Sequence, residues 1–105
     1  DLGELDDAIS DFQKAAKLSK KLGKAYAQNA YARMRRPDYK EKRVQSLLQK
    51  AVRRDKTLAR PHYVLCNMLK ERNRRQARRH CVTYLEISKK RGDYAAEARL
   101  LLQSL

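Results

Sequence analysis

The chain has 105 residues, which is the size of a single domain. Its 3 glycines and 2 prolines are too few for a turn-rich β-sandwich, a β-barrel or a flexible linker. Its 26 basic residues outnumber its 12 acidic residues, and the net charge at pH 7 is +14. Because apolar residues recur at helical spacing throughout, we expect a folded, all-α, basic protein rather than a disordered chain.

The positive charge is concentrated in the middle of the chain. Residues 23–60 and 61–91 carry net charges of +9 and +7, whereas residues 1–22 and 92–105 each carry −1. Such a surface either attracts an acidic partner or only keeps a helical protein in solution.

Six helices are predicted from apolar residues that lie three and four positions apart. Gly23 is expected to end the first helix as a left-handed cap, and Pro37 and Gly92 follow the second and fifth helices. Pro61 is expected in the first turn of the fourth helix, where its missing N–H does no harm. The expected ranges are about 4–21, 24–36, 39–55, 61–71, 74–90 and 93–105.

One pattern, with internal spacings of four and three residues, recurs in the first, third and fifth predicted helices. Its members are Ala8, Phe12 and Ala15, then Val44, Leu48 and Ala51, then Ala77, Cys81 and Tyr84. The last members of successive sets lie 36 and 33 residues apart. A period near 34 is typical of helix–turn–helix repeats in which small residues let paired helices approach closely.

With this pattern the chain resembles the tetratricopeptide repeat family. Gly3 matches the turn glycine of that family, Ala8 its small inter-helix contact, Phe12 its wedge and Ala15 its contact to the next repeat. The matches in the last repeat are His62, Leu65, Cys66 and Leu69. The chain departs from the pattern mainly at Val44, where the family has Ala, and at Tyr84, which is bulky where Ala is usual.

The resemblance implies antiparallel helical hairpins stacked as a short right-handed superhelix. A partial first repeat would occupy residues 1–22, followed by repeats over 23–57 and 58–91 and a capping helix over 93–105. Because the chain begins inside a repeat, we expect it to be a fragment of a larger protein.

Two cysteines, Cys66 and Cys81, are too few for a disulfide framework. We expect them to be small buried residues in a reducing, cytoplasmic compartment, with a disulfide across one helical hairpin as the alternative. A zinc site with His62 and His80 is disfavoured, because His80 and Cys81 are consecutive and point about 100° apart on a helix. We therefore expect no metal.

No spacing supports catalysis or a bound cofactor, so we expect neither an enzyme nor a cofactor site. No apolar stretch approaches the roughly 18 residues that a membrane span needs.

In the tetratricopeptide family the first helix of each repeat lines a concave surface. In this chain the corresponding helices are the second and fourth predicted helices. On both of them, cations, amides and tyrosines recur at the spacing of one helix face. Such a face suits an acidic or extended peptide of a partner protein. The expected groove residues are Tyr26, Asn29, Arg33, Arg36, Arg60, Tyr63, Asn67 and Lys70. The alternative for these residues is that the tyrosines only pack and the arginines are only solvated.

Two further functions compete with this protein-interaction scaffold. Nonspecific binding of a nucleic-acid backbone would use an arginine-rich edge at the turn after the fourth helix. Its residues are Arg72, Arg74, Arg75, Arg78 and Arg79. A similar basic cluster lies one repeat earlier, from Arg35 to Arg43. The other competing function is a structural module that self-associates through the open end of the first repeat.

Overall fold

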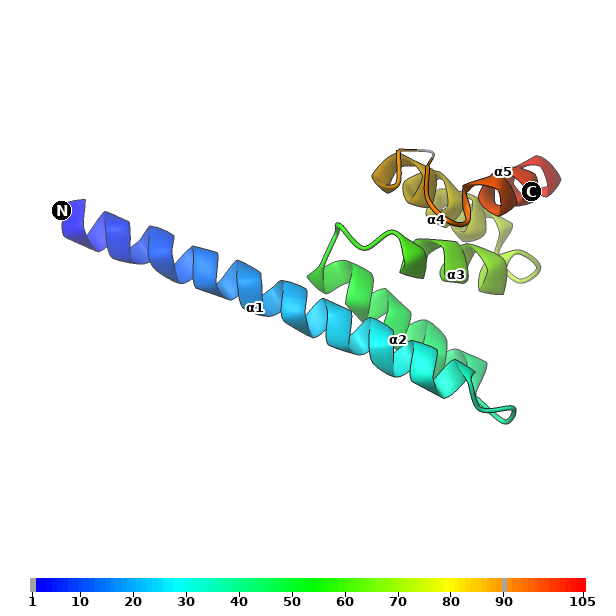
Figure 1. The fold of residues 1–105 in the computed structure, drawn as a ribbon, viewed down its shortest axis with the longest axis horizontal. Coiled ribbons are helices and arrows are strands. Elements are labelled where there is room, and N and C mark those ends of the chain that lie inside the picture. Colours follow the sequence, from blue (N-terminus) through cyan, green and yellow to red (C-terminus); the bar gives the residue numbers. More distant parts are fainter. Residues whose placement is uncertain (1, 90) are drawn as a thin grey trace.

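The computed structural model describes the backbone of residues 2–89 and 91–105 and, within the first twelve residues, the side chains of residues 4, 7, 10 and 11 alone. These residues form five α-helices and no strand, so the all-α prediction is confirmed. The helices are arranged as two hairpins and a closing helix (Figure 1).

The first helix is nearly twice as long as predicted. α1 (Leu2–Met34) continues through Gly23, where the sequence predicted a stop. Gly23 does not have the left-handed backbone of a helix cap. It is buried against the end of α2 (Glu41–Arg54), where an added Cβ would lie 2.9 Å from the Cβ of Asp55 and 3.0 Å from the carbonyl oxygen of Ala51. The glycine thus permits a close approach of two helices, and the prediction of a cap is wrong.

The predicted first repeat does not form a separate unit. Gly3 and the expected boundary between residues 22 and 23 both lie within α1, so there is no turn at either place. The side chains of Ala8 and Phe12 lie outside the described residues, and Ala15 is exposed rather than packed against a neighbouring helix. A partial repeat before two complete repeats was expected, and the described residues form two hairpins.

The first hairpin pairs α2 with the C-terminal part of α1, while the N-terminal part of α1 projects away from the other helices (Figure 1). The Ser19 hydroxyl donates to the carbonyl oxygen of Arg54 over 2.9 Å, and side chains 13–18 on the projecting part are exposed. The core of this hairpin contains Ala30 of α1 and Val44, Leu47 and Leu48 of α2. Leu65 of the next helix joins the same cluster, which connects the two hairpins.

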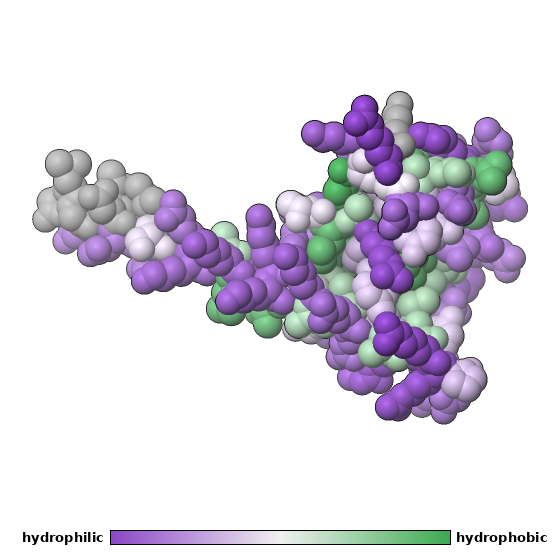
Figure 2. Space-filling view, viewed as in Figure 1, coloured by the Kyte–Doolittle hydropathy of each residue, from purple (hydrophilic) through white to green (hydrophobic). Residues whose placement is uncertain are grey.

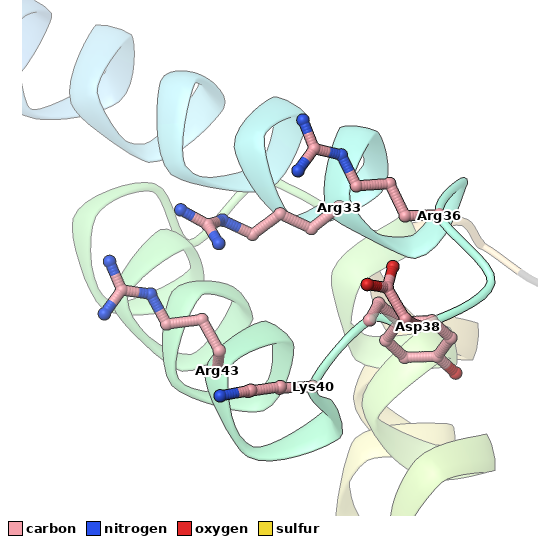
Figure 3. A pocket seen from close by; sticks show the side chains of 6 residues that line it. Arg33, Arg36, Asp38, Lys40 and Arg43 are labelled. Carbon is pink, nitrogen blue, oxygen red and sulfur yellow. The ribbon is translucent and has the colours of Figure 1, made fainter.

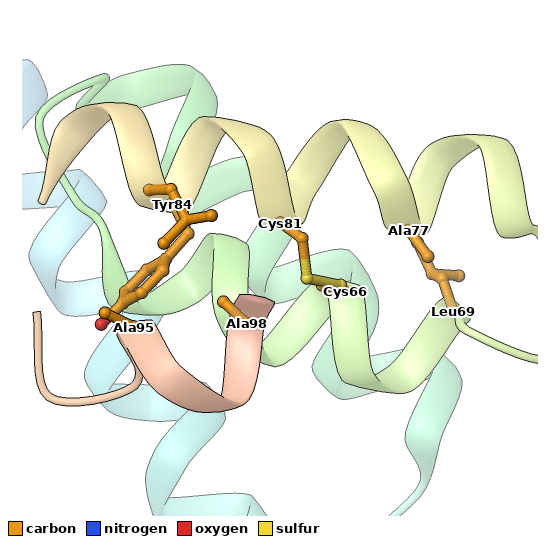
Figure 4. Packing of buried hydrophobic residues seen from close by; sticks show 8 residues of the cluster. Cys66, Leu69, Ala77, Cys81, Tyr84, Ala95 and Ala98 are labelled. Atoms are coloured by element: carbon orange, nitrogen blue, oxygen red, sulfur yellow. A yellow bond between two sulfur atoms is a disulfide. The ribbon is translucent and has the colours of Figure 1, made fainter. Parts of the chain in front are cut away.

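The second hairpin consists of α3 (Arg60–Leu69) and α4 (Arg74–Ile87), and α5 (Ala95–Ser104) packs against it. Pro61 lies in the first turn of α3, as predicted. The Asn73 side chain caps α4 by accepting a hydrogen bond from the N–H of Gln76 over 3.2 Å. Apolar side chains from all three helices, including Leu69, Ala77 and Ala98, form the second core (Figure 4).

The recurring pattern of the sequence marks the buried faces of two helices. In α2, Val44, Leu48 and Ala51 are fully buried. In α4, the equivalent set of Ala77, Cys81 and Tyr84 is buried as well. The bulky side chain of Tyr84 fits beside the start of α5, where its hydroxyl accepts a hydrogen bond from the N–H of Tyr94 over 2.8 Å.

The two cysteines are bonded to each other. Cys66 of α3 and Cys81 of α4 form a disulfide, with Cα atoms 5.4 Å apart, and the prediction of two free thiols is wrong (Figure 4). Both residues occupy facing positions of an antiparallel hairpin, which brings their sulfur atoms together. Disulfides persist mainly in oxidising compartments, so the cysteines no longer support a reducing environment.

A charged residue is buried directly after α2. Asp55 follows α2 and is 1% exposed. Burial by itself would raise the pKa of Asp55, but hydrogen bonds from the O–H and N–H of Thr57 and the charges of Lys20 and Lys24 lower it below its usual value. Asp55 is therefore charged in the folded protein at neutral pH.

Within the described residues, no helix has both the length and the apolar character that crossing a membrane requires.

Candidate functional site

The four site residues predicted on the fourth helix lie together. Arg60, Tyr63 and Asn67 of α3 and Lys70, which directly follows α3, line one hollow of about 320 Å³. Met34, at the end of α1, lines it as well. The spacing of three and four residues along α3 places all four predicted side chains on one helix face.

A second hollow continues the first toward α1. Tyr31, Met34 and Arg35 line this space of about 250 Å³ opposite Arg60 and Val64. Met34, Arg60 and Val64 line both hollows, which therefore join into one groove. We name it the α1–α3 groove, defined by Tyr31, Met34, Arg35, Arg60, Asn67 and Lys70.

The other four predicted groove residues, three on α1 and Arg36 in the turn after it, lie outside the α1–α3 groove. Asn29, Arg33 and Arg36 line separate hollows near the turn between α1 and α2. Tyr26 lies beside α2, with the Nζ of Lys50 5.9 Å from its ring centre. The structure thus divides the eight predicted residues between different surfaces.

The helical phase of α1 explains this division. Ala27 and Ala30 are buried against α2, and successive residues point about 100° apart. Tyr31 and Arg35 consequently lie on the side of α1 that faces α3, while Arg33 lies on the opposite side. The small residues at positions 23, 27 and 30 are the signal in the sequence that fixes this phase.

Tyrosine rings hold Arg60 in the groove. Its guanidinium carbon lies 4.4 Å from the ring centre of Tyr31 and 5.9 Å from that of Tyr94, both within cation–π range. Tyr94 in turn stacks on Tyr63, with ring centres 4.5 Å apart and planes within 7°. Burial raises the pKa of Tyr31 to about 12 despite the opposing charge of Arg60, so Tyr31 stays neutral beside this cation.

A second basic surface lies at the turn between α1 and α2 (Figure 3). Arg33 at the end of α1 and Arg36 in the turn after it line a hollow of about 340 Å³, together with Lys40 and Arg43 at the start of α2. We name this space the turn hollow. Asp38 is the one acidic residue in its lining.

The arginines of the predicted phosphate-binding edge lie around the turn from α3 to α4. Arg72 forms an ion pair with Glu41 at the start of α2 over 3.4 Å, and both side chains are about half exposed. Arg78 donates to the carbonyl oxygen of Leu105. The remaining members, Arg74, Arg75 and Arg79, are exposed.

Both histidines meet between α3 and α4. The Nδ1 atoms of His62 and His80 are 3.0 Å apart, a distance at which one neutral ring donates a hydrogen bond to the other. Burial lowers the pKa of His62 to about 4 and also lowers the pKa of His80, whose neighbour Arg79 adds to the effect. The sulfur atoms of Cys66 and Cys81 are engaged in the disulfide, and no group of three or more metal-ligating side chains occurs among the described residues.

Comparison of the chain with models of known protein families, with curated proteins and with solved structures finds no match.

Proposed function

We propose that this chain is a tetratricopeptide-like interaction module that binds an acidic, extended segment of another protein in the α1–α3 groove. The observation that carries the proposal is the composition of the groove. Arg35, Arg60 and Lys70 supply positive charge around the apolar side chains of Met34 and Val64, and Glu41, the carboxylate in this lining, is paired with Arg72. Such a lining suits a peptide in which acidic and apolar side chains alternate.

The relation between the two hairpins supports a repeat array. α2 and α4 each have 14 residues, and their buried sets of residues are 33 positions apart. α3 packs against α2, and the first helix of each hairpin contributes to the groove, as the resemblance implies. α5 covers the second hairpin in the place of a capping helix.

Arg60 is positioned for a carboxylate before any ligand arrives. The guanidinium carbon of Arg60 lies over the ring of Tyr31 and within cation–π range of Tyr94, and no acidic partner of Arg60 occurs among the described residues. The N–H groups at the edges of a stacked guanidinium can grip a carboxylate with two parallel hydrogen bonds. Asn67, in the same groove, can bond to a peptide backbone. The proposed function is binding alone, without catalysis, a metal or a cofactor.

The test compares two variants of equal charge. A short fluorescein-labelled peptide in which Glu alternates with Leu is the probe, and fluorescence anisotropy gives its affinity. We expect Arg60→Glu with Lys70→Glu to weaken binding by about tenfold or more, because each charge-assisted hydrogen bond contributes about 1.5–3 kcal/mol. The control, Arg53→Glu with Arg54→Glu, changes the charge equally at the far end of α2 and should lower affinity much less.

Equal losses in both variants would show that only the net charge attracts the peptide, and the groove would then not be the site. Circular dichroism must show the same helical signal for both variants.

Nonspecific nucleic-acid binding is the second candidate function. The ion pair between Arg72 and Glu41 brings the turn after α3 to the start of α2, so the two basic clusters meet at one edge. Affinity for a random duplex should then fall steeply with salt. Replacing Arg74, Arg75 and Arg79 by Ala should flatten the salt dependence, and absence of binding at low salt would dismiss this function.

Self-association is the third candidate. Leu18 and Leu22 are 58% and 38% exposed, and a small apolar patch is visible on the projecting part of α1 (Figure 2). Light scattering over a range of concentrations would detect such association. A cytoplasmic location stays a prediction, and the disulfide between Cys66 and Cys81 disfavours it.

A further inference from the structure

The turn hollow is a concentrated positive site that the α1–α3 groove does not include. We propose that it binds the phosphoryl group of a phosphorylated serine or threonine in the same peptide that occupies the groove, an inference that rests on the proposed function. The ligand of the whole surface would then be an acidic, phosphorylated segment of a partner protein.

The charge of the hollow fits a phosphoryl group better than a carboxylate. Four cationic side chains line it against the single carboxylate of Asp38, and none of the four forms an ion pair with a described residue. A phosphoryl group carries a charge of about −1.5 to −2 and three acceptor oxygens, which can engage several arginines at once. A carboxylate offers one charge and two oxygens.

Arg33 is held in place by a hydrogen bond to Asn29. The Nε of Arg33 donates to the side-chain oxygen of Asn29, one turn earlier, over 3.0 Å. This bond leaves both terminal nitrogens of Arg33 available for a ligand. Asn29 thereby acts on the ligand through Arg33 rather than by direct contact.

The start of α2 adds to the attraction for an anion. Lys40, at the N-cap of α2, provides no side-chain cap, and the N–H groups of Glu41 and Lys42 have no acceptor among the described residues. Unpaired N–H groups and the helix dipole favour negative charge at this end. The carboxylate of Glu41 is paired with Arg72, and Glu41 lines the groove and not the hollow.

The position of the hollow connects it to the groove. Tyr39, in the turn between α1 and α2, lines both spaces. A peptide that lies along the groove and continues past Tyr39 would bring its next residues to the turn hollow. This adjacency favours a phosphopeptide, because a single peptide chain can occupy both spaces.

The experiment measures what phosphorylation adds to binding. The probes are the Glu–Leu peptide and the same peptide with one phosphoserine near its end. For the unaltered protein we expect phosphorylation to raise affinity about tenfold. Arg33→Gln with Arg43→Gln should abolish this gain and leave the affinity for the unphosphorylated peptide unchanged. Arg53→Gln with Arg54→Gln, with the same loss of charge, should keep the gain.

The outcomes separate this inference from the proposed function. If the unphosphorylated peptide binds and phosphorylation adds nothing, the hollow is not a phosphoryl site, although the groove remains the peptide site. If neither peptide binds, the proposed function fails. A titration with free phosphoserine, followed by NMR of the arginine Nε–H signals, then still tests whether the turn hollow binds a phosphoryl group. Absence of shifts at Arg33 and Arg43 would overturn the inference. Tighter binding of a random duplex than of the phosphopeptide, lost in the Arg33/Arg43 variant, would overturn it in favour of nucleic acid.

Discussion

Gly23 of α1 and Asp55 after α2 are in such close contact that a methyl group on Gly23 would lie 2.9 Å from the Cβ of Asp55. Replacing an ordinary helix-interior glycine by alanine stabilises a protein by about 1 kcal/mol, because alanine favours the helix. At Gly23 the crowding should outweigh this gain, since overpacking typically costs about 1–3 kcal/mol. We therefore expect Gly23→Ala to lower the free energy of unfolding, measured by urea titration with circular dichroism.

The control for this prediction is Ala32→Gly, an exposed position on the same helix. It should lower the free energy of unfolding by about 1 kcal/mol through helix propensity alone. A gain in stability for Gly23→Ala would contradict the close approach of α1 and α2.

The disulfide should account for a large share of the stability. Cys66 and Cys81 are 15 residues apart in sequence. Closing a loop of this size stabilises the folded state by about 3 kcal/mol, mainly by restricting the unfolded chain. Reduction with dithiothreitol should lower the unfolding free energy by about that amount. Two titratable thiols in the unfolded, unreduced protein would show that the bond is absent.

Tyr84 and Gly92 should be energetically coupled. A Cβ on Gly92 would overlap the hydroxyl of Tyr84, which accepts the N–H of Tyr94. Tyr84→Phe should cost about 1 kcal/mol through the lost hydrogen bond, and Gly92→Ala about 1–3 kcal/mol through overlap. Because the first change removes the overlapping atom, the double variant should lose less than the sum. Strict additivity in urea unfolding would argue against this contact.

The histidine pair should make the fold sensitive to mild acid. The pKa of His62 is about 4 in the folded protein, and the pKa of His80 is lowered as well, so the unfolded chain binds more protons between pH 6.5 and about 4. Stability should fall as the pH decreases through this range. Asp55, whose pKa is lowered, should contribute a separate loss only at more acidic pH.

Replacing His62 and His80 together by Gln should make the free energy of unfolding nearly independent of pH between 6.5 and 4. The loss of stability at lower pH should remain. Titration of both histidines near pH 6.5 by NMR would contradict the pairing.

The helices after α1 were predictable because each has a buried face that repeats every three or four residues. Val44, Leu48 and Ala51 identify the inner face of α2, and the pattern recurs in α4. The continuity of α1 was not predictable from Gly23 alone. Glycine marks both helix ends and close helix contacts, and only the position of α2 distinguishes the two.

The candidate site was predictable on α3 and not on α1. Arg60, Asn67 and Lys70 share a face that their spacing reveals. On α1, the face toward α3 depends on which residues α2 buries, and this depends on the packing of a helix nearly twice the expected length. The Cys66–Cys81 bond likewise depends on the pairing of α3 with α4, because spacing along the chain does not bring two thiols together.

The most direct test of the account maps where the acidic peptide binds. Titration of the ¹⁵N-labelled protein with the Glu–Leu peptide should shift the amide signals of Tyr31, Arg35, Asn67 and Lys70, which lie in or beside the α1–α3 groove. The signals of Arg53 and Arg54, at the opposite end of α2, should stay in place. Shifts confined to the turn after α3, or spread evenly over every basic surface, would contradict a groove between the two hairpins.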